Sequence, residues 1–263
     1  MSTVDVDGIR LDTRVHAGDR DLAAIVFLHE GVGCIDLWRS FPQEVRVASG
    51  GPATVLYSRA GYGHSDPAML PRPVTYMHDE ADRVLPEILD RFDVERCVIV
   101  GHSDGASIAL LAAGGAARTA SRIAGLVLLA PHVFVEDVTI DAIEAAREAY
   151  LHSHLRRRLA RYHDHVDNAF YGWNDVWLSP GFRSWDITDR LATITCPVAL
   201  VQGRADPYGT TAQLDAIAAG VRGPVDQTVI DGVGHAPHVE APGPTVAATV
   251  ALLREVATRS GRP

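Results

Sequence analysis

The fold of this chain is decided by residues 97–117, which read CVIVGHSDGASIALLAAGGAA. Residues 97–100 are wholly apolar, which is typical of a strand buried on both faces of a sheet. Residues 106–117 are apolar and rich in alanine, which favours a helix. Between them, Gly101-His102-Ser103-Asp104-Gly105 predicts a sharp turn, because glycine permits backbone conformations and close approaches that a Cβ atom would forbid. The stretch therefore predicts a buried strand, a tight turn and a helix in direct succession.

Apolar strands and helical segments alternate on both sides of this stretch. Strands are predicted in an N-terminal hairpin that turns at Asp7-Gly8 and over residues 23–28, 53–57, 97–100, 123–129, 198–201 and 225–230. Helices are predicted over residues 36–48, 75–91 with a kink at Pro86, 106–117, 210–219 and 244–258. Strands that alternate with helices form a parallel sheet with helices on both faces. We therefore expect an α/β fold with a mostly parallel central sheet of about eight strands.

The alternation stops between residues 132 and 186. This segment has helical patches and holds 9 of the 17 aromatic residues of the chain, Trp173 and Trp177 among them. We interpret residues 132–186 as a helical insertion into one core domain formed by residues 1–131 and 187–263. Aromatic side chains hold small helical units together and also line apolar ligand sites, so Trp173 and Trp177 are candidates for a substrate pocket.

The composition excludes several classes of protein. Of the 263 residues, 47% are hydrophobic and 22% are charged, which is the balance of an ordinary globular chain. The net charge of −9 disfavours nucleic acid as a partner. The sequence contains no lysine, which excludes Schiff-base and P-loop chemistry. No apolar run is long enough to span a membrane, and the N-terminus lacks the pattern of a signal peptide, so a cytoplasmic location is expected.

A reactive side chain is expected within the turn. Gly101–Gly105 matches the pattern G-x-S-x-G, and a strand entering and a helix leaving are the context in which this turn presents a serine above a sheet. Gly63-His64-Ser65-Asp66 repeats four of these letters, but Pro67 follows it and no apolar strand abuts it. Ser103 is therefore the predicted nucleophile, and Ser65 is not. His102, beside the predicted nucleophile, is a candidate for contact with substrate.

A serine hydroxyl needs a histidine base and an acid that orients the base. The elbow motif predicts the chain order Ser, then Asp or Glu, then His. His235 lies in a glycine-rich loop directly after the last strand and is the predicted base, whereas His238 is interpreted as its neighbour. Asp206 follows the preceding strand and is the predicted acid. Glu136 and Asp137, which follow an earlier strand, are the alternatives for the acid.

Histidine pairs in the insertion raise the question of a metal site. His152 and His154 are two residues apart, as are His163 and His165, and on a helix such positions point to different faces. A pair of histidines is not a full ligand set, and no cysteine lies nearby. We interpret these histidines as polar surface of the insertion and expect no metal.

These motifs resemble those of the α/β-hydrolase superfamily, and the likeness covers nearly the whole chain. The segments that carry it are His29-Glu30-Gly31, residues 58–65, Gly101–Gly105, residues 203–206 and Gly234-His235. The resemblance implies that Ser103, Asp206 and His235 form a catalytic triad. It also implies that residues 132–186 form a lid over the pocket.

The loop after the third strand departs from the family pattern. That pattern is usually His-Gly, whereas Glu30 occupies the second position here and Gly31 follows it. The loop normally donates one main-chain N–H to an oxyanion hole, and the residue after the nucleophile donates the other. The expected donors are Asp104 together with Glu30 or Gly31. The carboxylate of Glu30 either lies at the edge of the pocket or pairs with an arginine such as Arg59.

The resemblance implies a cofactor-free serine hydrolase that acts on an ester or related acyl substrate. Carbon–carbon bond hydrolysis of dienone ring-fission products, thioester hydrolysis and lactone hydrolysis use the same groups and remain alternatives. Haloalkane dehalogenases and epoxide hydrolases of this fold use an aspartate as nucleophile, which Ser103 disfavours. A small-molecule receptor of the same fold is the non-enzymatic alternative. The expected partner is a small-molecule substrate, with no nucleic acid or membrane, and nothing in the sequence specifies the oligomeric state.

Overall fold

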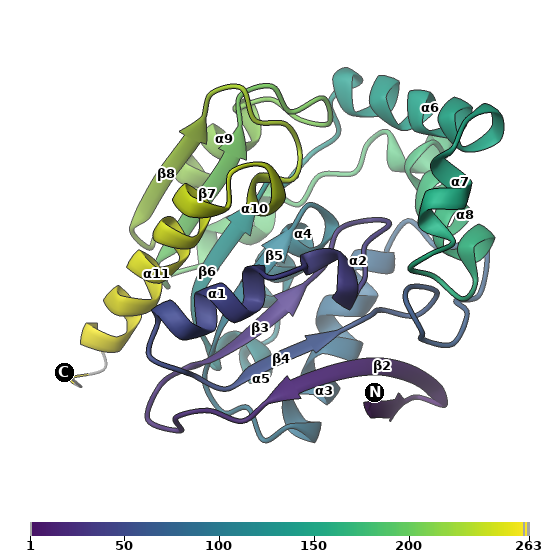
Figure 1. The fold of residues 1–263 in the computed structure, drawn as a ribbon. Coiled ribbons are helices and arrows are strands. Elements are labelled where there is room, and N and C mark those ends of the chain that lie inside the picture. Colours follow the sequence, from purple (N-terminus) through teal and green to yellow (C-terminus); the bar gives the residue numbers. More distant parts are fainter. Residues whose placement is uncertain (1, 260, 262–263) are drawn as a thin grey trace.

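The computed structural model describes residues 2–259 and 261 and contains an eight-stranded sheet (Figure 1). The strands are β1 (Ser2–Val6), β2 (Ile9–His16), β3 (Ala24–Leu28), β4 (Thr54–Tyr57), β5 (Cys97–His102), β6 (Ile123–Leu129), β7 (Val198–Gly203) and β8 (Val225–Ile230). They lie in the order β1-β2-β4-β3-β5-β6-β7-β8. Strand β2 pairs with both β1 and β4 in antiparallel fashion. All other neighbouring strands of the sheet pair in parallel fashion. The predicted α/β fold with a mostly parallel sheet is confirmed.

Helices cover both faces of this sheet (Figure 1). They are α1 (Phe41–Ala48), α2 (Tyr76–Asp79), α3 (Leu85–Arg91), α4 (Asp104–Ala113), α5 (Ala117–Ala120), α6 (Asp137–His152), α7 (Leu155–Leu159), α8 (Val166–Trp177), α9 (Ala212–Gly220), α10 (Pro237–Glu240) and α11 (Pro242–Arg259). Helices α1 and α11 pack on one face, and α3 and α4 pack on the other. Within the described residues, none of these helices combines the length and the apolar character that a membrane crossing requires.

The central strands are mostly apolar because each of them faces two cores. In β3, Ile25 and Phe27 join the core beneath α1 and α11, whereas Val26 and Leu28 join the core beneath α4. All four side chains are at most 1% exposed. Successive residues of a strand point to opposite faces, so burial on both faces removes the apolar–polar alternation of a half-exposed strand.

The segment between β4 and β5 differs in detail from the single kinked helix that the sequence predicts. Helix α2 ends at Asp79, a wide π-helical turn spans Glu80–Val84, and α3 begins at Leu85 with Pro86 in its first turn. Proline lacks an N–H and its ring crowds the carbonyl group four residues earlier. The wide turn therefore lies directly before Pro86, which has no N–H to continue a regular helix from it, and Pro86 lies in the first turn of α3.

Residues 132–186 lie beyond the carboxyl ends of the parallel strands, where α6, α7 and α8 gather at the upper right of Figure 1. His163, just before α8, is only 4% exposed, so the prediction that it is a surface residue is wrong. Its Nδ1 accepts a hydrogen bond from the N–H of Gly63 at 2.9 Å, and its Nε2 donates to the carbonyl oxygen of Val32 at 3.0 Å. His163 therefore joins residues 132–186 to the two loops that contain Val32 and Gly63.

The turn after β5 gives a stability prediction. A Cβ atom at Gly105 would overlap the carbonyl oxygen of Leu28, which cannot retreat because Leu28 pairs with Gly101 in the sheet. We expect Gly105→Ala to lower the free energy of unfolding by about 3 kcal/mol in urea denaturation. Gly243→Ala in α11 is the control, since nothing lies within 4 Å of its added Cβ, and it should change stability by no more than about 0.5 kcal/mol. Equal stability of the two variants would contradict the close approach at this turn.

Candidate active site

The turn between β5 and α4 holds Ser103 in a strained backbone conformation. Its φ of 53° and ψ of −117° lie in a region that residues with a Cβ rarely adopt, at a cost of about 1–3 kcal/mol. Two glycines make the turn possible: a Cβ at Gly101 would lie 2.6 Å from the Cα of Ala106, and one at Gly105 would overlap a main-chain oxygen of β3. A serine in such a turn projects above the carboxyl ends of the strands.

The two serines in similar sequence contexts have different surroundings. Ser65 is buried, and its hydroxyl donates to the carbonyl oxygen of Ser58 at 2.7 Å and accepts from the N–H of Asp12 at 2.9 Å. Both hydrogen-bonding roles of Ser65 are therefore used inside the protein. The hydroxyl of Ser103, by contrast, makes no hydrogen bond to any residue that the structure describes. Ser103 is thus the one of these two serines whose hydroxyl has no partner among the described residues.

The loops after β7 and β8 bring Asp206 and His235 into contact. Nδ1 of His235 lies 2.9 Å and 2.8 Å from the two carboxylate oxygens of Asp206. The carboxylate also accepts the main-chain N–H of Tyr208 at 2.8 Å. Although burial alone raises it, the hydrogen bond from His235 holds the pKa of Asp206 below its usual value. An ionised carboxylate that accepts Nδ1–H leaves Nε2 of His235 as the basic nitrogen.

His102 joins the serine turn to the loop that carries His235. Its Nε2 donates to the carbonyl oxygen of His235 at 2.8 Å, and its Nδ1 lies 3.3 Å from a carboxylate oxygen of Glu30. Burial opposes a charge on His102, but the Glu30 carboxylate raises the pKa of His102 above its usual value. Likewise, burial opposes the charge of Glu30, but the bond to His102 holds the pKa of Glu30 well below its usual range. Because His102 is 2% exposed and has these two partners, its ring holds the backbone beside Ser103 in place.

The predicted pairing of Glu30 with Arg59 is wrong. Nη2 of Arg59 donates to the main-chain oxygen of Glu30 at 2.8 Å, and the carboxylate of Glu30 pairs with His102. Nη1 of Arg59 instead lies 3.6 Å from a carboxylate oxygen of Asp104, and both side chains are almost fully buried. Asp104 is a second buried acid within reach of the guanidinium of Arg59. No pattern in the sequence indicates which of the two acids Arg59 pairs with.

Three main-chain N–H groups, in the serine turn and in the loop after β3, have no hydrogen-bond acceptor among the described residues. They belong to Glu30, Gly31 and Asp104. Asp104 begins α4, and the first N–H groups of a helix lack acceptors within the helix and carry its positive partial charge. Gly31 lies against the indole ring of Trp173, which a Cβ at Gly31 would overlap. The role of these N–H groups as donors to an oxyanion stays a prediction.

The alternative acids and the second histidine are engaged elsewhere. The carboxylate of Glu136 accepts bonds from the N–H and the hydroxyl of Thr210 at 3.0 Å and 2.6 Å. Asp137 is exposed and pairs with Arg183. His238 is buried against the ring of Trp38, and burial lowers its pKa to about 3. Asp206 is thus the carboxylate that contacts His235.

The two candidate pocket tryptophans lie in different surroundings. Trp177 is 1% exposed, its Nε1 donates to the hydroxyl of Tyr76 at 3.0 Å, and its ring packs against Phe182. Trp173 lies against Gly31, and its ring centroid is 6.4 Å from that of Tyr208. Trp173 therefore covers the loop with the free N–H groups, whereas Trp177 anchors α8 to α2. Contact of either ring with substrate stays a prediction.

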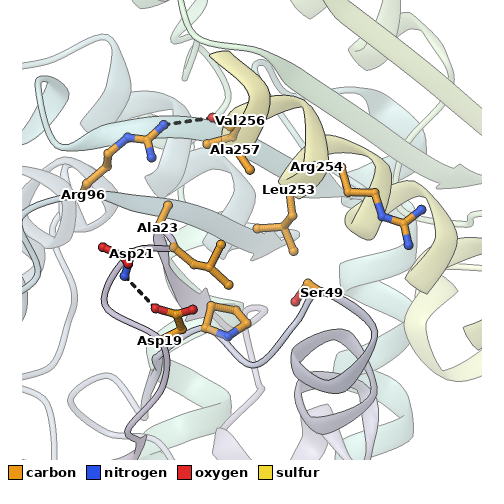
Figure 2. Close-up of a pocket in the computed structure, with 11 residues that line it drawn as sticks. Asp19, Asp21, Ala23, Ser49, Arg96, Leu253, Arg254, Val256 and Ala257 are labelled. Carbon is orange, nitrogen blue, oxygen red and sulfur yellow. Dashed lines mark hydrogen bonds between the residues drawn. The ribbon is translucent and has the colours of Figure 1, made fainter. Parts of the chain in front are cut away.

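A cavity of about 540 Å³ lies at the other end of the sheet (Figure 2). It is lined by residues that precede β3 and β5 and by the last turns of α11, among them Ala23, Arg96 and Leu253. Arg96 donates to the main-chain oxygen of Val256 across it at 3.1 Å. The six residues of β5 place it roughly 20 Å from Ser103. This cavity is therefore separate from the candidate active site.

A strained serine between a buried strand and a helix, with a histidine–aspartate pair at the same edge of the sheet, is the arrangement of an α/β-fold hydrolase. The model of the alpha/beta hydrolase family matches residues 25–249, and the chain belongs to this family. Family membership makes the chain a hydrolase.

Comparison with known proteins gives one curated relative and several structural neighbours. Epoxide hydrolase A of Mycobacterium tuberculosis is 37% identical over 79 residues, which are 29% of this chain and 24% of that protein. The match thus spans about a quarter of that relative's length. Proline iminopeptidase from Mycobacterium smegmatis has a TM-score of 0.74 at 16% identity and covers 98% of this chain and 99% of its own. A thermophilic esterase from Thermogutta terrifontis has a TM-score of 0.71 at 18% identity, covering 97% and 99%. These neighbours share the fold.

The ion pair behind the serine turn gives a pH-dependent prediction. Because its pKa is lowered in the fold, the Glu30 carboxylate contributes its full stabilisation at pH values above the ordinary glutamate pKa of 4.5. Because its pKa is raised in the fold, His102 contributes its full stabilisation at pH values below the ordinary histidine pKa of 6.5. We expect Glu30→Gln to lower the free energy of unfolding by about 2 kcal/mol between these two pH values. The difference should shrink as pH falls below this window or rises through the raised pKa of His102.

Urea denaturation across this pH range measures the effect, with Glu44→Gln on the exposed face of α1 as the control. The control should change stability little at any pH. A loss of the same size at about pH 5 and about pH 9 in Glu30→Gln would contradict the ion pair.

Proposed function

We propose that this chain is a serine hydrolase that cleaves an ester or related acyl substrate without a cofactor. The observation that carries the proposal is the contact of His235 with buried Asp206 at the edge of the sheet where Ser103 stands in its strained turn. A histidine held in the Nδ1–H tautomer by a carboxylate presents Nε2 as a general base. A serine whose hydroxyl has no partner inside the protein is the group that such a base activates.

The proposed reaction has two stages. The hydroxyl oxygen of Ser103 attacks the acyl carbonyl carbon while Nε2 of His235 takes the hydroxyl proton. The resulting oxyanion accepts hydrogen bonds from the N–H of Asp104 and from that of Glu30 or Gly31, each worth about 3 kcal/mol of the barrier. His235 then protonates the leaving oxygen, which departs and leaves an acyl-enzyme. A water molecule then attacks the acyl carbon and gives a proton to Nε2 of His235. The bond from the acyl carbon to the Ser103 oxygen breaks, His235 returns the proton to that oxygen, and the acid is released.

Residues 132–186 serve as a lid in this proposal. The contact of Trp173 with Gly31 and the two bonds from His163 to the core support that role, because all of them lie beyond the carboxyl ends of the strands. A cover in this position keeps water from the acyl site and sets which acyl groups fit. The aromatic side chains of the lid favour a moderately hydrophobic acyl group.

Carbon–carbon bond hydrolysis is the second reaction that the same three residues can perform. Epoxide opening, suggested by the name of the curated relative, requires an aspartate nucleophile in this fold, and position 103 is a serine. A panel of p-nitrophenyl esters, thioesters and dienone ring-fission products distinguishes ester from thioester and carbon–carbon cleavage. We expect turnover of the p-nitrophenyl esters, and its loss in Ser103→Ala.

Asp206 gives the sharpest kinetic prediction. Asparagine in place of Asp206 keeps the shape but presents an amide that favours the other imidazole tautomer, so Nε2 of His235 no longer acts as a base. We expect Asp206→Asn to lower kcat for a p-nitrophenyl ester by roughly 10⁴-fold while thermal unfolding stays close to that of wild type.

Glu136→Gln is the matched control, because Glu136 was the alternative acid and bonds Thr210 instead. Its kcat should stay within a few-fold of the wild-type value. Wild-type kcat in Asp206→Asn, combined with a large loss in Glu136→Gln, would transfer the orienting role to Glu136 and defeat the proposed triad.

A further inference from the structure

Trp173 in α8 lies against the loop that follows β3. A Cβ atom added to Gly31 would lie 2.2 Å from Cδ1 and 2.3 Å from Nε1 of Trp173, so the edge of the indole ring that carries the N–H rests on the Cα of Gly31. The same loop begins beside the serine turn, because a Cβ at Gly105 would lie 2.8 Å from the carbonyl oxygen of His29. Gly105 comes two residues after Ser103, so Trp173 lies against a loop that adjoins the proposed nucleophile.

The indole N–H of Trp173 has no hydrogen-bond acceptor among the described residues, and it is not sealed in the interior. Within residues 132–186, Trp177 donates its N–H to the hydroxyl of Tyr76 at 3.0 Å, and the N–H of Trp185 is unpaired but fully buried. Nε1 of Trp173 is unpaired as well, yet it keeps some exposed surface although the residue as a whole is only 7% exposed. Trp173 is thus the tryptophan of this segment whose N–H a bound molecule can reach.

The ring of Trp173 lies between two parts of the candidate active site. On one side it touches Gly31, whose main-chain N–H has no acceptor among the described residues. On the other side its centroid is 6.4 Å from that of Tyr208, and the ring of Tyr208 is 4.6 Å from that of His235. The indole therefore stands between the loop of the candidate oxyanion donors and the side chain that packs against the proposed base.

The N–H of Trp173 is close enough to that of Gly31 for both to reach one oxygen atom. A Cβ position lies about 2.5 Å from the main-chain nitrogen of its own residue, and Nε1 of Trp173 lies 2.3 Å from that position at Gly31. The two nitrogen atoms are therefore no more than about 5 Å apart. Two donors that bond one oxygen at about 2.9 Å each can stand up to about 5.8 Å apart. Because an indole N–H donates and never accepts, the shared partner is an acceptor such as a carbonyl oxygen.

We propose that the indole N–H of Trp173 donates a hydrogen bond to the oxyanion that forms when Ser103 attacks the substrate. The inference rests on the proposed serine chemistry and adds a side-chain donor to the main-chain donors. As the bond from the Ser103 oxygen to the carbonyl carbon forms, the carbonyl π electrons move to the carbonyl oxygen, which carries the charge until the leaving group departs. A donor placed where this charge develops lowers the barrier more than it strengthens substrate binding. Trp173 is thus a catalytic residue that the segment 132–186 supplies to the core domain.

An isosteric replacement tests the role of this one N–H. Benzothienylalanine, incorporated at position 173 by amber suppression, keeps the bicyclic ring but has sulfur where tryptophan has the N–H. We expect kcat for the p-nitrophenyl esters of acetate, butyrate and hexanoate to fall by about 10²-fold, the effect of losing one oxyanion donor, while each KM stays within about 3-fold of wild type. The loss should be the same for all three esters, because all of them form the same oxyanion.

An inhibitor that forms the oxyanion without turnover gives a second readout. Ser103 adds to the carbonyl carbon of a trifluoromethyl ketone to give a tetrahedral oxyanion, whereas the methyl ketone with the same butyl chain stays trigonal. The replacement at position 173 should raise the inhibition constant of the trifluoromethyl ketone by about 10²-fold and leave that of the methyl ketone within about 3-fold. Trp173→Phe also lacks the N–H and serves as a second variant, with losses in the same direction in both assays.

Benzothienylalanine at position 185 is the matched control. Trp185 is 7% exposed, like Trp173, but its ring packs on Phe182 with a centroid distance of 5.3 Å, and its N–H has no partner to lose. This variant should keep the wild-type kcat and the wild-type inhibition by both ketones. An equal loss of kcat at position 185 would show that the analogue acts through packing, and it would overturn the inference.

The failure of this inference is distinct from the failure of the proposed function. If kcat of the position-173 variant stays within about 3-fold of wild type, or falls by different factors for the three esters, the inference is overturned. Unequal factors would mean that the ring only lines the acyl pocket. If Ser103→Ala hydrolyses every ester as fast as wild type, the serine chemistry itself is wrong, and the inference falls with it.

Discussion

The structure depends on the backbone of Ser103, which has to turn from a strand into a helix at a positive φ of 53°. This conformation is sustained because Gly101 and Gly105 let β5, α4 and β3 approach without Cβ atoms between them. The turn places the Ser103 hydroxyl at the carboxyl edge of the sheet and makes the N–H of Asp104 the first free donor of α4. One local constraint thus sets the position of the proposed nucleophile and of one oxyanion donor together.

The remaining groups are held to this turn by contacts between distant parts of the chain. His102 bonds the main chain of His235, Glu30 pairs with His102, and Arg59 holds the carbonyl oxygen of Glu30. Three loops that follow β3, β4 and β8 therefore meet around the residue before Ser103. Glu30 is the charged residue of this network, because its carboxylate pairs with His102. The carboxylate of Glu30 therefore helps to hold His102, the residue before Ser103, in place.

Local patterns in the sequence predicted the parts of the structure that depend on local physics. Continuous apolar runs predicted the buried strands, and the strand–turn–helix context separated Ser103 from Ser65. The pairing of buried polar side chains was not predictable, because Arg59 could reach either Glu30 or Asp104 and only the folded positions decide between them. For the same reason, no local signal distinguished the buried His163 from the exposed histidines of residues 132–186.

Covalent labelling tests the central claim most directly, because a fluorophosphonate reacts rapidly only with a serine that a base has activated. Intact-protein and peptide mass spectrometry would be used to locate the adduct in wild type, Ser103→Ala and Ser65→Ala. The account predicts one adduct per chain, on Ser103, in wild type and in Ser65→Ala, and none in Ser103→Ala. An adduct on Ser65, or undiminished labelling of Ser103→Ala, would contradict it.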